Sequence, residues 1–132
     1  LILEITEASA MVVPDIVQSC MCELQAEGVL FALDDFGAGY TSLRYLKSFC
    51  FDILKIDGQF IENIQEDVDN QVLMHALVDV ARHFEMITVA ERVETSREAA
   101  FLKAVGIECL QGYLFGAPTL TPKWENPRTR RP

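Results

Sequence analysis

Two adjacent aspartates, Asp34 and Asp35, stand directly before a glycine-spaced segment in the stretch LDDFGAGYTSL. Neighbouring ionised carboxylates repel each other, so a fold that keeps both needs a cation or solvent to compensate. Carboxylate oxygens suit Mg²⁺ or Mn²⁺ better than zinc. Two adjacent aspartates can bridge two such ions, an arrangement used in metal-assisted cleavage of phosphodiesters. The pair therefore predicts a site for divalent metal ions.

The aspartate pair belongs to a larger set of polar side chains, which lie where the strand-like segments of this sequence end. They are Glu4, Glu7, Asp34, Asp35, Lys55, Asp57, Glu91, Glu94 and Gln111. In parallel α/β proteins the carboxyl ends of the strands meet at one rim, where ligands bind. At such a rim Lys55 could hold an attacking water or steady the charge that develops on a phosphate, and Glu91 could act as general base. The alternative for Lys55 is a structural ion pair at the end of its strand.

Apolar runs alternate with helical patterns along the chain. Strands are expected at 1–6, 29–33, 51–57, 86–91 and 108–115, and helices at 14–28, from 41 or 42 to 49, at 69–84 and at 96–106. We expect the helix at 69–84 to bury Val72, Leu73, Ala76, Leu77, Val80 and Ala81, and the helix at 96–106 to begin with a serine cap. Strands that alternate with helices indicate a parallel sheet. The pattern allows an open doubly wound sheet as well as part of a (β/α)8 barrel.

Bulk composition narrows the classes of function. A chain of 132 residues is long enough for one domain, and its net charge of −9 argues against binding to DNA or RNA. No apolar run approaches the length of a membrane span, so we expect a cytoplasmic protein. The four cysteines lack zinc-site spacing and are expected to be buried, reduced thiols. His75 and His83 are expected to be surface or packing residues.

The glycine-spaced segment after the aspartates has two interpretations. Gly37 and Gly39 could permit a tight turn that exposes amides to an anion, or they could form a mobile lid. No Lys-Ser or Lys-Thr pair follows, so the segment is not a Walker phosphate loop.

Five stretches together carry a resemblance to a known family: LEITE, LDDFGAGYTSLRYL, DILKIDGQFI, TVAERVET and LQGYLFGAP. In order and spacing they resemble the second half of an EAL domain, the bacterial cyclic di-GMP phosphodiesterase family. The resemblance covers residues 1–118 and leaves 119–132 as a Pro- and Arg-rich tail, which we expect to be disordered. It implies a TIM-like (β/α)8 barrel, of which about five β/α units are present here.

The resemblance also implies a reaction, the hydrolysis of cyclic di-GMP to linear pGpG with two Mg²⁺ or Mn²⁺ ions. Glu4 and Asp34 would be metal ligands, and Asp35 would hold the second ion. Lys55 would contact the nucleophilic water, and Glu91 would be the general base or a ligand acting through a water.

Three more side chains, and the glycines of the segment after the aspartates, carry implied supporting roles. Gln111 would lie just behind the residues that touch the metal ions, and Glu94 would be a further supporting carboxylate. Glu7 would brace the glycine-spaced segment around Gly37 and Gly39, which in this family shapes the metal site and couples it to a dimer interface. A homodimer is therefore expected, and GGDEF, PAS or receiver domains are common companions in such proteins.

The sequence departs from the family pattern in two respects. The Glu-Ala-Leu signature and an asparagine metal ligand would lie on strands before Leu1, and a complete barrel has eight strands and about 250 residues. We therefore expect a fragment of a longer protein that binds metal weakly and shows little or no hydrolysis alone. The second departure is Arg92, which stands where the family has glycine and could pair with Glu91 or Glu94.

Two other hypotheses remain at this level. The chain could be a degenerate, non-catalytic EAL-like module that binds cyclic di-GMP or a partner protein. It could also be an α/β domain whose carboxylates at the strand ends serve structure alone.

Overall fold

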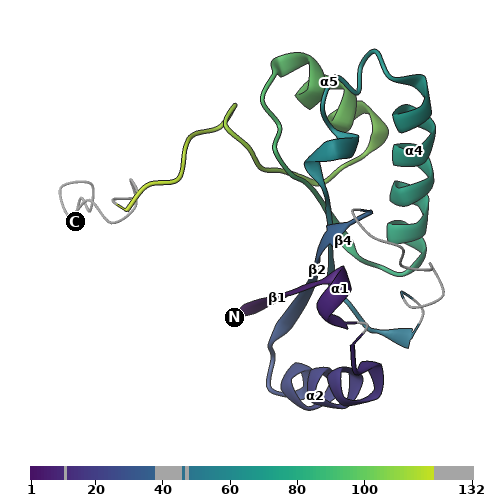
Figure 1. Cartoon of the computed structure of the whole chain (residues 1–132), viewed down its shortest axis with the longest axis vertical. Coiled ribbons are helices and arrows are strands. Elements are labelled where there is room, and N and C mark those ends of the chain that lie inside the picture. The colour runs from purple at the N-terminus through teal and green to yellow at the C-terminus, as the bar shows by residue number, and fades with distance from the viewer. Residues whose placement is uncertain (11, 38–45, 47, 121–132) are drawn as a thin grey trace, which may run out of the picture.

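A computed structural model describes residues 1–10, 12–37, 46 and 48–120 of the chain, and these form one parallel sheet with helices beside it (Figure 1). The strands are β1 (Ile2–Thr6), β2 (Leu30–Phe36), β3 (Ile53–Ile56), β4 (Ile87–Ala90) and β5 (Cys109–Leu110). They pair in chain order, each parallel to its neighbour. A doubly wound sheet reverses its strand order, so the sequential order fits the expected partial barrel instead.

The helical elements fill the connections between the strands. They are α1 (Glu7–Ala10), α2 (Pro14–Ala26), the 3₁₀ helix η1 (Gly58–Phe60), α4 (Val68–His83) and α5 (Ser96–Val105). The helix expected from 41 or 42 to 49 falls largely outside the described residues, as does the tail from 121 onward. Within the described part of the chain, no helix is long and apolar enough to cross a membrane.

Two strands depart most from the sequence prediction, and the other three are one to three residues shorter than their expected ranges. The strand expected at 29–33 continues through both aspartates to Phe36. The strand expected at 108–115 was wrong beyond Leu110, because Gly112 brings the chain against Val93 and a turn follows, with the amide of Phe115 donating to the carbonyl of Gly112. The short α1 helix was not predicted at all.

The buried face of α4 also differs from the prediction. Ala81 is buried and Leu77 and Val80 are partly buried, as predicted, but the predicted Val72, Leu73 and Ala76 are exposed. Met74 and Val78, which were not predicted, are buried instead. The buried side of the helix is therefore rotated relative to the predicted one. Two sides of this helix are similarly apolar in sequence, and packing against β4 and α5 decides which of them is buried.

The ends of α5 follow capping chemistry, with one change of residue. Thr95, not the predicted serine, is the N-cap, and it forms a capping box with Glu98. Gly106 ends the helix with a φ of 105°, a left-handed conformation that favours glycine.

Among the described residues, the two faces of the sheet differ in burial: helices cover one, and the other, here called the open face, carries exposed apolar side chains although Ala32, Ile53 and Lys55 on it are buried. On the covered face Leu33, Leu54, Ile56, Thr88 and Ala90 are buried. On the opposite face Ile2, Leu30 and Ile87 are 50%, 41% and 45% exposed. The strand register places Glu4, Asp34 and Lys55 on this open face, so it is also the face that carries the chemistry.

The cysteines were predicted to be buried, and that prediction was wrong. Cys20, Cys22, Cys50 and Cys109 are all free and exposed. The exposure of Cys109 follows from its register opposite Val89, on the open face of the sheet. His75 and His83 are exposed residues whose rings pack edge-on against Phe101 and Phe84, as the packing interpretation predicted.

Candidate metal centre

The carboxyl ends of four strands bring their polar side chains together. Lys55 on β3 lies at the middle, with its Nζ 3.0 Å from Glu4, 2.8 Å from Asp34 and 2.9 Å from Glu91. These partners come from β1, from β2 and from the residue after β4. Four residues that are far apart in the sequence thus meet at the rim of the sheet.

Burial and charge fix the state of the lysine at this centre. Lys55 is 6% exposed. Burial by itself would lower its pKa, but hydrogen bonds to Asp34, Glu91 and Glu4 outweigh that effect and raise the pKa of Lys55 above its ordinary value. The ammonium therefore stays charged at neutral pH and acts as a cation and proton donor, not as a base.

A bulge in β2 brings the two neighbouring aspartates to one side of the sheet. Leu33 pairs with Leu54, but the next paired residue is Phe36, opposite Ile56, so β2 holds one residue more than β3 across this interval. Asp35 takes up the difference with a φ of 54°. Successive side chains of a regular strand point to opposite faces, and the extra residue removes that alternation here.

The result is a compact group of carboxylates. Oxygens from Asp34, Asp35 and Glu91 all lie within 4.8 Å of one another, and all three residues are partly buried. Oxygen ligands without histidine or thiolate match the preference of Mg²⁺, Mn²⁺ and Ca²⁺. A divalent cation would also relieve the repulsion between three clustered negative charges, so the residues present fit such an ion. Glu4 is linked to this group indirectly, because Lys55 forms ion pairs with Glu4 as well as with Asp34 and Glu91.

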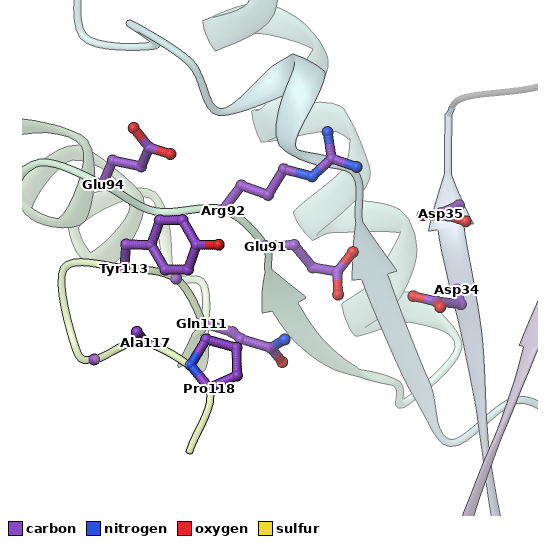
Figure 2. A pocket seen from close by; sticks show the side chains of 11 residues that line it. Asp34, Asp35, Glu91, Arg92, Glu94, Gln111, Tyr113, Ala117 and Pro118 are labelled. Carbon is purple, nitrogen blue, oxygen red and sulfur yellow. The ribbon is translucent and has the colours of Figure 1, made fainter. Parts of the chain in front are cut away.

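A cavity of about 580 Å³ extends from these carboxylates to the segment after β5 (Figure 2). Its lining includes Asp34, Asp35, Glu91, Arg92, Glu94, Gln111 and Tyr113. In Figure 2 the side chain of Gln111 lies next to that of Glu91, whereas Glu94 lies on the opposite side of the view from the aspartates. The structure therefore places Gln111 near this group of carboxylates and Glu94 farther along the cavity wall.

Glu7 meets the start of the glycine-spaced segment. Its side chain is 4% exposed, and its carboxylate accepts a hydrogen bond of 3.0 Å from the amide of Gly37. Glu7 is thus joined by a hydrogen bond to the residue that begins this segment. Gly39, the other glycine singled out from the sequence, lies outside the described residues.

Arg92 occupies a conformation that suits glycine, with a φ of 54°. The expected pairing with Glu91 or Glu94 was wrong, since among the described residues the ion pair of Arg92 is with Asp57, at 3.7 Å. The left-handed backbone turns the side chain toward the segment after β3 instead. Figure 2 shows its stem leaving the chain beside Glu91.

Sequence reasoning missed Gly112 and Tyr113, which line the cavity after Gln111. A Cβ placed on Gly112 would lie 2.2 Å from the backbone nitrogen and oxygen of Val93, so only glycine allows this approach. The contact joins the segment after β5 to the segment after β4. The one available signal was the glycine that directly follows Gln111 in the sequence.

The EAL domain profile matches residues 1–118. The chain belongs to the EAL domain family. Among curated EAL relatives, the bifunctional diguanylate cyclase/cyclic di-GMP phosphodiesterase MucR of Pseudomonas aeruginosa is 42% identical over 118 residues, or 89% of this chain and 17% of MucR. The cyclic di-GMP phosphodiesterase PdeL of Escherichia coli is 36% identical over 89% of this chain and 33% of PdeL. The chain thus spans a minor part of these relatives.

Solved EAL structures match the fold closely. The P. aeruginosa MucR phosphodiesterase in complex with c-di-GMP aligns with a TM-score of 0.81 and 42% identity, covering 90% of this chain and 48% of that one. The BlrP1 protein of Klebsiella pneumoniae in complex with manganese and cyclic di-GMP aligns with a TM-score of 0.84 and 33% identity, covering 89% and 30%. BlrP1 has also been solved with calcium in place of manganese.

Proposed function

We propose that this chain is the C-terminal part of a cyclic di-GMP phosphodiesterase domain that uses two Mg²⁺ or Mn²⁺ ions. The observation that carries the proposal is the convergence of Asp34, Asp35 and Glu91 within 4.8 Å, beside the charged amine of Lys55. The manganese and cyclic di-GMP bound to BlrP1 support the choice of metal and ligand. The proposed reaction adds one water across one phosphodiester bond and yields linear pGpG.

In this proposal each side chain has a role that follows from its chemistry. Asp34 and Asp35 would hold the metal ions, with Glu4 as a further ligand from β1. Bound divalent ions would lower the pKa of a ligating water and offset charge on the phosphate. The ammonium of Lys55 would orient that water and donate to the phosphate oxygen that gains charge.

Glu91 would accept the proton of the attacking water. It lies next to the aspartate pair, its side chain is 13% exposed, and Lys55 holds one of its oxygens at 2.9 Å. Gln111 and Glu94, on the cavity wall, would position the rest of the dinucleotide. Residues 1–118 would form the domain part, and the intact protein would work as a dimer.

The decisive experiment measures pGpG release from cyclic di-GMP by the full-length protein that contains these residues, with Mg²⁺, with Mn²⁺ and with a chelator. We expect metal-dependent turnover in the parent protein, its loss in Glu91→Gln, and little or none from the 132-residue chain alone. Turnover that persists in the chelator would contradict the two-metal proposal.

A second candidate is a non-catalytic module that binds cyclic di-GMP or a partner protein. The observation in its favour is Arg92, a bulky cation in a left-handed conformation directly after the proposed base. Calorimetry separates the two candidates, because binding without metal and without turnover would identify the sensor.

A further inference from the structure

The 3₁₀ helix η1 lies between the two segments that carry the proposed metal ligands. It begins directly after Asp57, whose Oδ1 accepts a hydrogen bond of 2.8 Å from the amide of Gln59. Asp57 is itself 6% exposed and stands two residues beyond Lys55. The helix is therefore anchored to the end of β3 by its own cap.

One side of η1 holds the residue that follows the aspartate pair. The amide nitrogen of the Gln59 side chain donates to the carbonyl of Gly37 at 3.0 Å, and the amide of Gly37 donates to Glu7. The ring of Phe60 covers the same glycine so closely that a Cβ there would lie 2.2 Å from it. The backbone N–H and C=O of Gly37 are thus both hydrogen-bonded, two residues beyond Asp35.

The other side of η1 supports the residue that follows Glu91. The stem of Arg92 lies on Gly58, where an added Cβ would be 2.5 Å from the Cδ and 2.7 Å from the Cβ of the arginine. The guanidinium lies 3.7 Å from the second oxygen of Asp57. The φ of Arg92 is 54°, a backbone conformation that is unfavourable for arginine, and in this conformation its side chain contacts both Gly58 and Asp57.

We propose that η1 is a brace that sets the position of Asp35 relative to Glu91, with Gln59 and Arg92 as its two positioning residues. Neither residue belongs to the carboxylate group itself. Each acts on the backbone one or two residues from a proposed ligand, so a shift of η1 would change the spacing of that group. The proposal rests on the assignment of a metal site to Asp34, Asp35 and Glu91.

A steric clash and the loss of the Arg92 side chain test the Arg92 side of the brace in the full-length protein. Gly58→Ala places a methyl group inside the space of the Arg92 stem, and we expect Mn²⁺ affinity measured by calorimetry to fall about tenfold, as for other residues that orient metal ligands. Arg92→Ala removes the stem that rests on Gly58, and we expect a similar fall. The double variant Gly58→Ala with Arg92→Ala has already lost that stem, so we expect its affinity to equal that of Arg92→Ala alone.

A matched pair of glutamines tests the other side. Gln59→Ala removes the bond to Gly37, and we expect faster hydrogen exchange at the Gly37 amide and weaker Mn²⁺ binding. Gln71→Ala is the control, since Gln71 makes the same kind of bond, 2.9 Å to the carbonyl of Ile64, away from the carboxylates. It should leave both readouts unchanged.

These readouts keep the brace distinguishable from the proposed reaction. Mn²⁺ affinity and amide exchange report on the brace even if cyclic di-GMP is not hydrolysed, and circular dichroism confirms that each variant is folded. Equal Mn²⁺ affinity in the wild type and Gly58→Ala, or effects of Gly58→Ala and Arg92→Ala that add in the double variant, would overturn the proposal. Equal effects of Gln59→Ala and Gln71→Ala would do the same.

Discussion

Asp34 and Asp35 are neighbours in the chain, yet their carboxylate oxygens lie within 4.8 Å of each other and of Glu91 on the same side of the sheet. A regular strand would have pointed one of them toward the helices. The bulge between Leu33 and Phe36 and the φ of 54° at Asp35 account for the difference. Local backbone geometry therefore turns a repulsive pair into a potential metal site.

Substitutions at Asp35 should separate backbone strain from charge. Asp35→Asn keeps a side chain that tolerates the left-handed region, so we expect unfolding free energy within about 0.5 kcal/mol of the wild type. Asp35→Val puts a β-branched residue there and should cost about 1–3 kcal/mol. Both changes should abolish tight Mn²⁺ binding. Denaturant unfolding and calorimetry on the full-length protein check this, and a valine variant as stable as the asparagine variant would contradict it.

Lys55 should be replaceable in part by a divalent cation. In Lys55→Met the three surrounding carboxylates lose their shared partner, and we expect a loss of about 1–3 kcal/mol, less than for a wholly buried pair because the Glu4 side chain is 52% exposed. Thermal unfolding with and without Mn²⁺ is the measurement, and the metal should stabilise Lys55→Met more than the wild type. Lys103→Met, at the exposed end of α5, is the control. A variant indifferent to Mn²⁺ would refute this account.

The strand ends were predictable because their signals are local. Apolar runs locate the strands, and parallel strands present ligands at their carboxyl ends, so sequence alone suffices to group Asp34, Lys55 and Glu91. The bulge at Asp35 was not predictable, since its left-handed φ is imposed by pairing with β3.

Other features that the sequence did not predict also depend on tertiary contacts. Val72 and Met74 are both apolar, and packing alone decides that Met74 is buried. The short β5 depends on a backbone contact between Gly112 and Val93, nineteen positions apart in a sequence that gives only the glycine as a hint. The partner of Arg92 likewise depends on a backbone φ that its residue type disfavours.

Glu98 should make stability depend on acid pH. Burial would raise its pKa, but hydrogen bonds from the backbone amides of Glu94, Thr95 and Asn63 outweigh this and lower the pKa below 4.5. A carboxyl with a lowered folded pKa stabilises the fold fully above its unfolded pKa, and the benefit disappears as pH falls through the folded value. We therefore expect Glu98→Gln to cost about 1–3 kcal/mol at pH 7 and progressively less below pH 4.5.

Denaturant unfolding of the full-length protein at a series of pH values measures this effect. Glu66→Gln is the matched control, because Glu66 lies 4.0 Å from the exposed Arg97 and should contribute less than about 0.5 kcal/mol at any pH. A difference between wild type and Glu98→Gln that stays constant from pH 7 to pH 3 would show that the charge of Glu98 is not responsible.

Thr88 should hold the short β5 in place. It is fully buried, its hydroxyl and amide both donate to the carboxylate of Glu108, and its hydroxyl accepts from the amide of Glu108 at 3.2 Å. Thr88→Val keeps the shape but leaves that amide without its acceptor, so we expect a loss of about 1–3 kcal/mol in unfolding free energy. Thr88→Ser keeps the hydroxyl and should lose only about 1 kcal/mol for the missing methyl. Because Glu108 directly precedes β5, hydrogen exchange at Leu110 should rise in Thr88→Val and not in Thr88→Ser. If Thr88→Ser were less stable than Thr88→Val, packing of the methyl group, and not the hydrogen bonds, would hold β5 against β4.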